Sequence, residues 1–257
     1  MRKFLFILCI CSLHFVSLAE SPPQGEDDIL RPVPWRMYVG PYAGGAWVVS
    51  NGRFETLCDC EYLSGQGFGL QLGAFADYPL TRDFSVFATL GYRMLRPSYE
   101  KSEQRLEYVP FGGGGDFLWV DFDLETTVVL SVVELGVAAK WDLPLRGLYV
   151  AVGPELGIIV DDNITEIEQI RTPGLTYDTN GSTEQTFMDG NMSEYYSDAA
   201  SYRLGLAARL GYMYPLHERL AVAPELMMTM PLTPVTSTYS DWKLATWQFN
   251  LYLRFAI

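Results

Sequence analysis

The sequence predicts an all-β chain that folds into one eight-stranded, antiparallel, up-and-down transmembrane β-barrel, with short periplasmic turns and long extracellular loops. Three observations predict this fold. Eight segments alternate apolar and polar residues with the period of a β-strand, the connections between them are alternately short and long, and the chain begins like a secreted protein.

The N-terminus has the pattern of a secretory signal peptide. Two basic residues precede the apolar run FLFILCICSLHFV, which leads to the small-x-small site Ser17-Leu18-Ala19. The run is too short to span a bilayer, so we expect cleavage after Ala19. The expected division of the chain is a signal peptide (1–19), a periplasmic N-terminal leader (20–34) and an outer-membrane β-barrel (35–257).

The mature chain is strongly acidic. Without residues 1–19 it keeps 16 Lys and Arg against 31 Asp and Glu, which gives a net charge of −15. Such a charge repels nucleic acid, so we expect no nucleic-acid partner. No later stretch holds 18 consecutive apolar residues, so the sequence predicts no membrane-spanning helix.

The last segment, TWQFNLYLRFAI, shows the alternation most clearly. Phe249, Leu251 and Leu253 share one face of the expected strand, and Asn250 and Tyr252 lie on the other. In a membrane barrel the apolar face meets lipid and the polar face lines the interior. The eight alternating segments cover residues 36–50, 67–78, 85–94, 133–141, 148–158, 203–212, 221–230 and 246–257.

The connections sort into two classes in a fixed order. PLTRD, DLPLRG and PLHER are tight turns, whereas residues 51–66, 96–126, 161–200 and 232–241 form longer joins. Short turns on one side and long loops on the other are typical of outer-membrane barrels. An open sheet edge in lipid would leave costly unpaired backbone groups, so we expect the last strand to pair with the first.

Aromatic residues cluster near the ends of the expected strands, where amphipathic rings suit the two membrane interfaces. They are Tyr38, Trp47, Tyr78, Tyr92, Trp141, Tyr212, Trp242 and Trp247.

Together, the signal peptide, the eight strands, the loop order and the aromatic last strand resemble the small outer-membrane barrels of Gram-negative bacteria. The pattern looks like the PorT-like outer membrane protein β-barrel domain group and the membrane domain of outer membrane protein A. This resemblance implies an outer-membrane location, with membrane lipids, lipopolysaccharide and the outer-membrane assembly machinery as partners. Such chains often end in Phe, whereas this one ends in Ile257, with Phe255 two residues earlier.

Charged residues on the expected inward face are the main candidate site. An eight-stranded barrel is just wide enough for side chains to fill it, so these charges should form ion pairs. We expect Arg93 beside Glu134, and Arg209 and Arg254 on either side of Glu225. Paired buried charges favour a plugged lumen; the alternative is a gated ion path. The predicted network comprises Asp77, Arg93, Glu134, Lys140, Glu155, Arg203, Arg209, Glu225 and Arg254.

The long connections carry weaker signals. The acidic segment 161–200 contains DTNGSTE, which lacks the spacing of a calcium loop, so a solvated acidic loop is favoured and no metal site is predicted. Cys58 and Cys60 predict a loop disulfide in an oxidising compartment, with a metal or redox site as the alternative. FGGGGD lacks the rest of a phosphate-binding motif and predicts a flexible loop tip.

The sequence predicts no catalytic residue and no cofactor. His217, the one histidine of the mature chain, lies in a short turn away from the long loops, which argues against a His-dependent lipid hydrolase. We therefore expect a structural or adhesive surface protein that displays acidic loops to an extracellular or periplasmic protein partner. The alternatives are a narrow transport or secretion-accessory barrel and a lipid-modifying outer-membrane enzyme.

Overall fold

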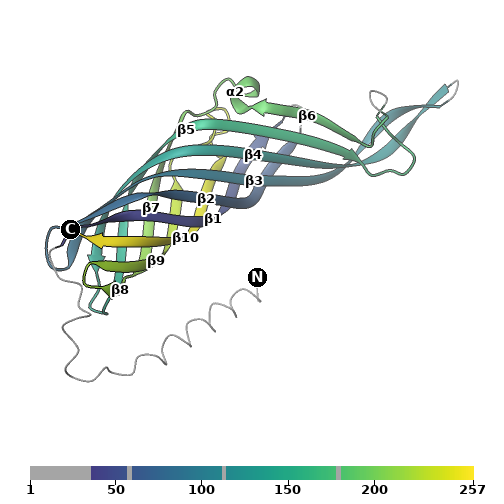
Figure 1. The fold of residues 1–257 in the computed structure, drawn as a ribbon. Coiled ribbons are helices and arrows are strands. Elements are labelled where there is room, and N and C mark those ends of the chain that lie inside the picture. The colour runs from purple at the N-terminus through teal and green to yellow at the C-terminus, as the bar shows by residue number, and fades with distance from the viewer. Residues whose placement is uncertain (1–35, 57–59, 112–113, 178–180) are drawn as a thin grey trace.

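The computed structural model of this chain describes residues 36–56, 60–111, 114–177 and 181–257. The predicted signal peptide and leader, residues 1–19 and 20–34, lie outside the described residues. In the described part, nearly all of the regular structure is β-strand, and the strands form one continuous antiparallel sheet (Figure 1).

Eight strands of the described chain close into a ring, which confirms the predicted fold. Each ring strand pairs antiparallel with the next, and β10 returns to pair with β1, where Trp47 faces Trp247. The ring strands are β1 (Tyr38–Glu55), β2 (Glu61–Pro79), β3 (Phe84–Phe111), β4 (Gly114–Asp142), β5 (Leu148–Ile170), β7 (Tyr202–Tyr212), β9 (Leu220–Pro231) and β10 (Lys243–Ala256).

Three short elements lie outside the ring. β6 (Glu184–Asn191) pairs with β5, and β8 (Tyr214–His217) pairs with β9 next to a short turn. The helix α2 (Met192–Tyr195) follows β6 directly. Among the described residues, no helix has the length and apolar character needed to cross a membrane.

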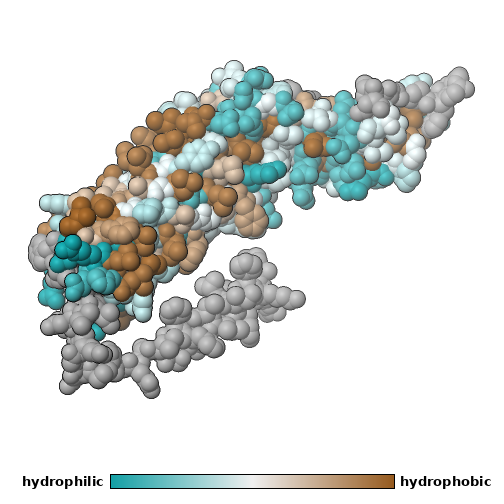
Figure 2. Space-filling view, in the orientation of Figure 1, coloured by the Kyte–Doolittle hydropathy of each residue, from teal (hydrophilic) through white to brown (hydrophobic). Residues whose placement is uncertain are grey.

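The alternating polar and apolar residues of each strand face the lumen and the outer wall respectively. Along β7, Arg203 and Arg209 are buried in the lumen, while Leu204 and Leu210 are exposed on the outer wall. The outer wall of the barrel carries a broad apolar belt, seen as brown in Figure 2. Phe68, for example, is 68% exposed. Lipid is a favourable neighbour for a continuous apolar belt and water is not, so the belt defines the membrane-spanning part.

The strands on one side of the barrel continue far beyond the belt, which corrects the expectation of a long loop over 96–126. β2 stops pairing with β3 at Ser98, but β3 and β4 pair on to Phe111 and Gly114. Residues 99–111 add roughly 40 Å at the rise of an extended strand. Residues 100–105 of β3 are polar on both faces, so the hydropathy of β3 no longer alternates there although its pairing continues. β4 keeps Val120, Phe122 and Leu124 buried on its inward face. Together with β5 and β6, β3 and β4 form a projecting sheet (Figure 1).

The interior holds two apolar clusters. The first, at the turn end, packs Tyr42, Phe75, Phe87 and Tyr252 against one another. The second lies at the projecting end, where Trp242 stacks on Phe54 with ring centroids 4.1 Å apart. Trp242 is fully buried and hydrogen-bonded to Ser50 and Tyr99. The prediction that Trp242 lies at a membrane interface is therefore wrong.

Leu90 and Leu106 both point outward from β3, but Leu90 lies in the middle of the apolar belt and Leu106 on the projection. We expect Leu90→Arg to lower the free energy of unfolding by about 2–4 kcal/mol, because a charge at the bilayer midplane is poorly solvated. Leu106→Arg should change it by less than about 0.5 kcal/mol. Urea unfolding in lipid vesicles measures both, and equal effects would contradict the assignment of the belt.

Candidate functional site

The lumen brings together most of the charged residues that the sequence places on the inward face. Arg93 on β3 lies 2.7 Å from Glu134 on β4 and 3.8 Å from Glu155 on β5. Its guanidinium also donates to Gln71 and Gln248 at 3.0 and 3.2 Å. Because these partners come from both sides of β3 and from across the ring, Arg93 bridges the lumen.

Arg209 on β7 forms the second centre of the network. It lies 3.1 Å from Glu155 and 3.4 Å from Glu225, so Glu155 links the two arginines. Arg209 also donates to the Tyr252 hydroxyl at 3.0 Å, and that hydroxyl donates to Glu225 at 3.1 Å. Arg209 also donates to Thr89 on β3 at 3.4 Å, a contact that crosses the lumen, so side chains fill the barrel at this level.

Arg254 does not flank Glu225, contrary to the expectation from strand order. It forms an ion pair with Asp77, which also accepts a 3.0 Å contact from Lys140. The register explains the difference, because Arg254 lies opposite Ala221, whereas Glu225 lies opposite Asn250. Four residues along a strand are about 13 Å, too far for a direct contact. Asp77, Lys140 and Arg254 therefore form a separate cluster nearer the turns.

Arg203 completes the predicted set. Its guanidinium donates to the Leu244 carbonyl at 3.0 Å, and its Nη1 has no hydrogen-bond partner within the described part of the chain. The sequence analysis missed the uncharged members of the network, among them Gln71, Tyr149 and Gln248. Their inward position follows from the same alternation, but their partners depend on the register, which the sequence alone does not supply.

The interior of the projecting end holds buried carboxylates, which corrects the expectation of a wholly solvated acidic loop over 161–200. Glu166 is fully buried on β5 and accepts hydrogen bonds from Thr56 at 2.5 Å and Thr126 at 3.4 Å. Burial raises the pKa of Glu166 above its ordinary value, and the two threonine hydroxyls oppose that rise. Glu168, also buried, pairs with Arg105 at 2.6 Å.

Nearby, Cys60 is buried and disulfide-bonded. Cys58 lies outside the described residues, so its pairing with Cys60 stays a prediction. Among the described residues, no group of three or more His, Cys, Asp or Glu side chains is arranged to hold a metal ion.

The tip of the projection carries an exposed aromatic patch that sequence reasoning missed. We define the aromatic tip as Leu106, Tyr108, Phe117 and Trp119, which share one face because Tyr108 pairs with Phe117 and Leu106 with Trp119. The rings of Tyr108 and Phe117 meet edge to face at 5.5 Å. Phe117 and Trp119 are 65% and 66% exposed. The signal in the sequence is the pair of patterns LxY and FxW on either side of the glycine run.

Comparison with known proteins finds solved structures with a similar fold but assigns the chain to no family. The sequence matches no protein-family model, and no curated protein is significantly similar to it. Solved structures similar to the chain include Neisserial surface protein A, with 12% identity over 86% of this chain and 97% of that chain, at a TM-score of 0.38.

Two further solved structures are similar to the chain at the same low level. The outer membrane protease OmpT of Escherichia coli has 7% identity over 88% of this chain and 98% of its own, at a TM-score of 0.34. The attachment invasion locus protein Ail of Yersinia pestis has 13% identity over 86% of this chain and 99% of its own, at a TM-score of 0.29. Similarities at this level assign no activity to this chain.

Glu155 connects Arg93 and Arg209, so its removal tests whether the lumen network stabilises the barrel. We expect Glu155→Ala to lower the free energy of unfolding by about 3–5 kcal/mol, because it leaves buried positive charge without its partner. Asp123→Ala, which breaks an exposed pair with Arg171, is the matched control and should have no measurable effect. Urea unfolding followed by tryptophan fluorescence measures both, and equal midpoints would contradict a stabilising network.

Proposed function

We propose that this barrel lies in the outer membrane of a Gram-negative bacterium, that ion pairs close its lumen, and that it acts as an adhesive surface protein. In this proposal the barrel is an anchor, and the projecting sheet presents the aromatic tip to a partner outside the cell. The exposure of the aromatic tip is the observation that carries the proposal. No catalytic role is assigned.

The lumen contacts support an anchor rather than a transport path. Arg93 on β3 donates to Gln248 on β10, and Arg209 on β7 donates to Thr89 on β3, so both contacts cross the ring. Buried apolar clusters lie toward the turns and toward the projecting end. A gated path would require these pairs to exchange partners in concert, and each buried charge that lost its partner would destabilise the barrel. A closed barrel keeps every pair in place.

The projection separates the aromatic tip from the membrane. Between the apolar belt and the tip, the outward face of the β3–β4 hairpin is polar, with Glu100 opposite Glu125 and Ser102 opposite Asp123. Leu106 lies eight positions after Ser98, roughly 26 Å along the strand. The aromatic tip is therefore not a continuation of the lipid-facing belt, and water is its solvent in the absence of a partner.

The composition of the aromatic tip indicates the chemistry of that partner. Large exposed aromatic side chains on a soluble surface mark interaction sites, and Trp and Tyr are enriched among the residues that dominate binding energy. Asp121 and Asp123 follow the aromatic tip on the same face of β4. The surface thus combines an apolar centre with an acidic flank, which is complementary to an apolar surface bordered by basic groups.

The test replaces the exposed rings and measures attachment. We expect Phe117→Ser with Trp119→Ser to reduce retention of expressing bacteria on polystyrene under flow to the level of bacteria without the protein, because each ring contributes about 1.5–3 kcal/mol when buried. Leu63→Ser is the matched control, since Leu63 is 65% exposed on β2 outside the aromatic tip. Retention of the double variant equal to wild type, with equal surface expression, would rule out adhesion through this surface.

A further inference from the structure

The outer wall of the barrel contains a continuous groove at the edge of the apolar belt nearer the projecting sheet. It consists of an apolar depression of about 630 Å³ and a polar depression of about 880 Å³, and both are lined by Trp47, Phe68 and Arg96. Each part falls within the size of typical small-molecule sites, roughly 300–1,000 Å³. The shared residues make the two depressions one groove that passes from an apolar to a polar lining.

Gly45 forms the floor of the apolar part. It points outward from β1 between its cross-strand partners Leu70 and Phe249, while in the row above, Trp47 lies between Phe68 and Trp247. A Cβ atom at Gly45 would come no closer than 4.0 Å to a neighbouring heavy atom, so the fold does not require glycine here. The absence of a side chain at Gly45 leaves a slot walled by leucine and aromatic side chains, which fits an acyl chain.

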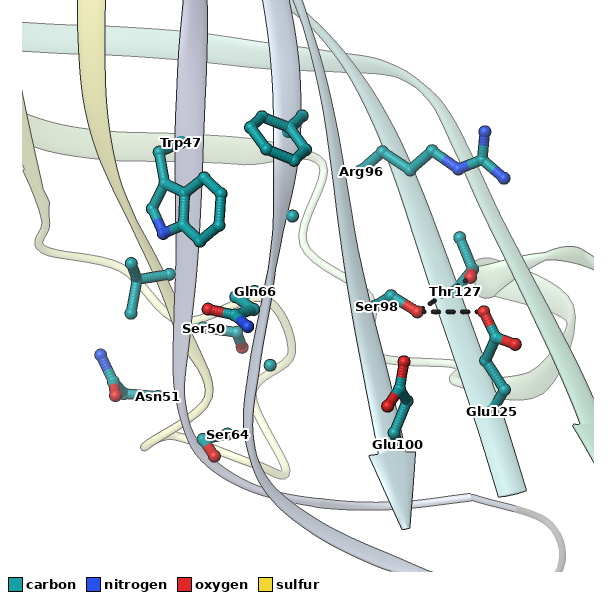
Figure 3. A pocket seen from close by; sticks show the side chains of 14 residues that line it. Trp47, Ser50, Asn51, Ser64, Gln66, Arg96, Ser98, Glu100, Glu125 and Thr127 are labelled. Atoms are coloured by element: carbon teal, nitrogen blue, oxygen red, sulfur yellow. Dashed lines mark hydrogen bonds between the residues drawn. The ribbon is translucent and has the colours of Figure 1, made fainter. Parts of the chain in front are cut away.

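The polar part begins where the slot ends. Figure 3 shows Trp47 and Arg96 at one end of this part and Glu100 and Glu125 at the other. Hydroxyl and amide side chains line the space between them, and Ser98 donates to Glu125 at 3.3 Å. Amides, hydroxyls and carboxylates in a shallow groove provide the acceptors and donors that sugar hydroxyls need.

Arg96 lies at the junction of the two parts. It is opposite Phe68 in the sheet and exposed, and its guanidinium has no ion pair or hydrogen bond within the described residues. A guanidinium without a carboxylate partner at the edge of the belt is suited to a phosphate, which it can bind through two N–H groups. Acyl slot, cation and hydroxyl-binding surface follow one another along the strand direction.

We propose that this groove binds one phosphorylated glycolipid of the outer leaflet, with an acyl chain over Gly45, a phosphate at Arg96 and sugar hydroxyls along the polar part. The proposal rests on the proposed outer-membrane location but not on adhesion. A lipid fits because the apolar part is continuous with the belt, where acyl chains are the solvent. The order of the three linings matches the order of the three parts of such a lipid.

The experiment measures lipid retention by the folded barrel. The full mature protein, purified in mild detergent and stripped of lipid, is titrated with lipid A and observed by native mass spectrometry. We expect one tightly bound lipid A per barrel. Gly45→Leu should weaken its binding about tenfold, since the new side chain displaces part of the acyl chain. Arg96→Gln should weaken binding of lipid A about tenfold but leave binding of the dephosphorylated lipid unchanged.

Matched controls separate the groove from the rest of the wall. Ala208→Leu places the same side chain at another outward-facing position of the belt on β7, and Arg82→Gln removes a charge from a turn at the other end of the barrel. Neither should change lipid binding. Equal binding by Gly45→Leu and Ala208→Leu, or equal preference of wild type and Arg96→Gln for the phosphorylated lipid, would overturn the proposal. Attachment through the aromatic tip should be the same in all four variants.

Discussion

Satisfaction of backbone hydrogen bonds in a solvent that offers none is the constraint on which this structure depends. In lipid, each unpaired N–H or C=O costs several kcal/mol, so a membrane-spanning sheet must have no edge. The pairing of β10 with β1, from Lys243 opposite Asn51 to Ala256 opposite Tyr38, removes the edge. Where the chain leaves the belt this constraint ends, and there β3 continues past the end of its pairing with β2.

Closure of the sheet determines the chemistry of both faces. The small interior can hold polar residues only if their groups pair, and Glu155 between Arg93 and Arg209 shows how one carboxylate serves two cations. The outer wall must instead present apolar side chains to lipid. A glycine there changes the shape of the lipid interface and not the packing of a core. Gly45 thus matters for what lies against the barrel, while Glu155 matters for the barrel itself.

The fold was predictable from sequence because alternation and turn chemistry are local. The alternation from Trp247 to Phe255 and the three tight turns required no knowledge of distant contacts, and the structure confirms the ring that they imply. The contact of Arg93 with Glu134 involves neighbouring strands and was expected for that reason. The pairing of Arg254 with Asp77 depends on register across the closure, which strand order does not give.

Other features were not predictable because their signal is not periodic hydropathy. Strand pairing in residues 100–105 continues with polar residues on both faces, so the pattern resembles a loop. Trp242 is buried by stacking on Phe54, a residue from the opposite end of the chain. Prediction of the groove over Gly45 would require the cross-strand partners on both sides of β1, which the sequence alone does not give.

The most direct test of the central claim is to measure whether lipid or water surrounds the outer wall. Nitroxide labels placed singly at residues 247–253, on a Cys58→Ser and Cys60→Ser background, report accessibility to oxygen and to a water-soluble nickel chelate in lipid vesicles. The lipid-facing assignment predicts a period of two, with 247, 249, 251 and 253 open to oxygen and shielded from nickel. Nickel accessibility at those four positions would contradict it.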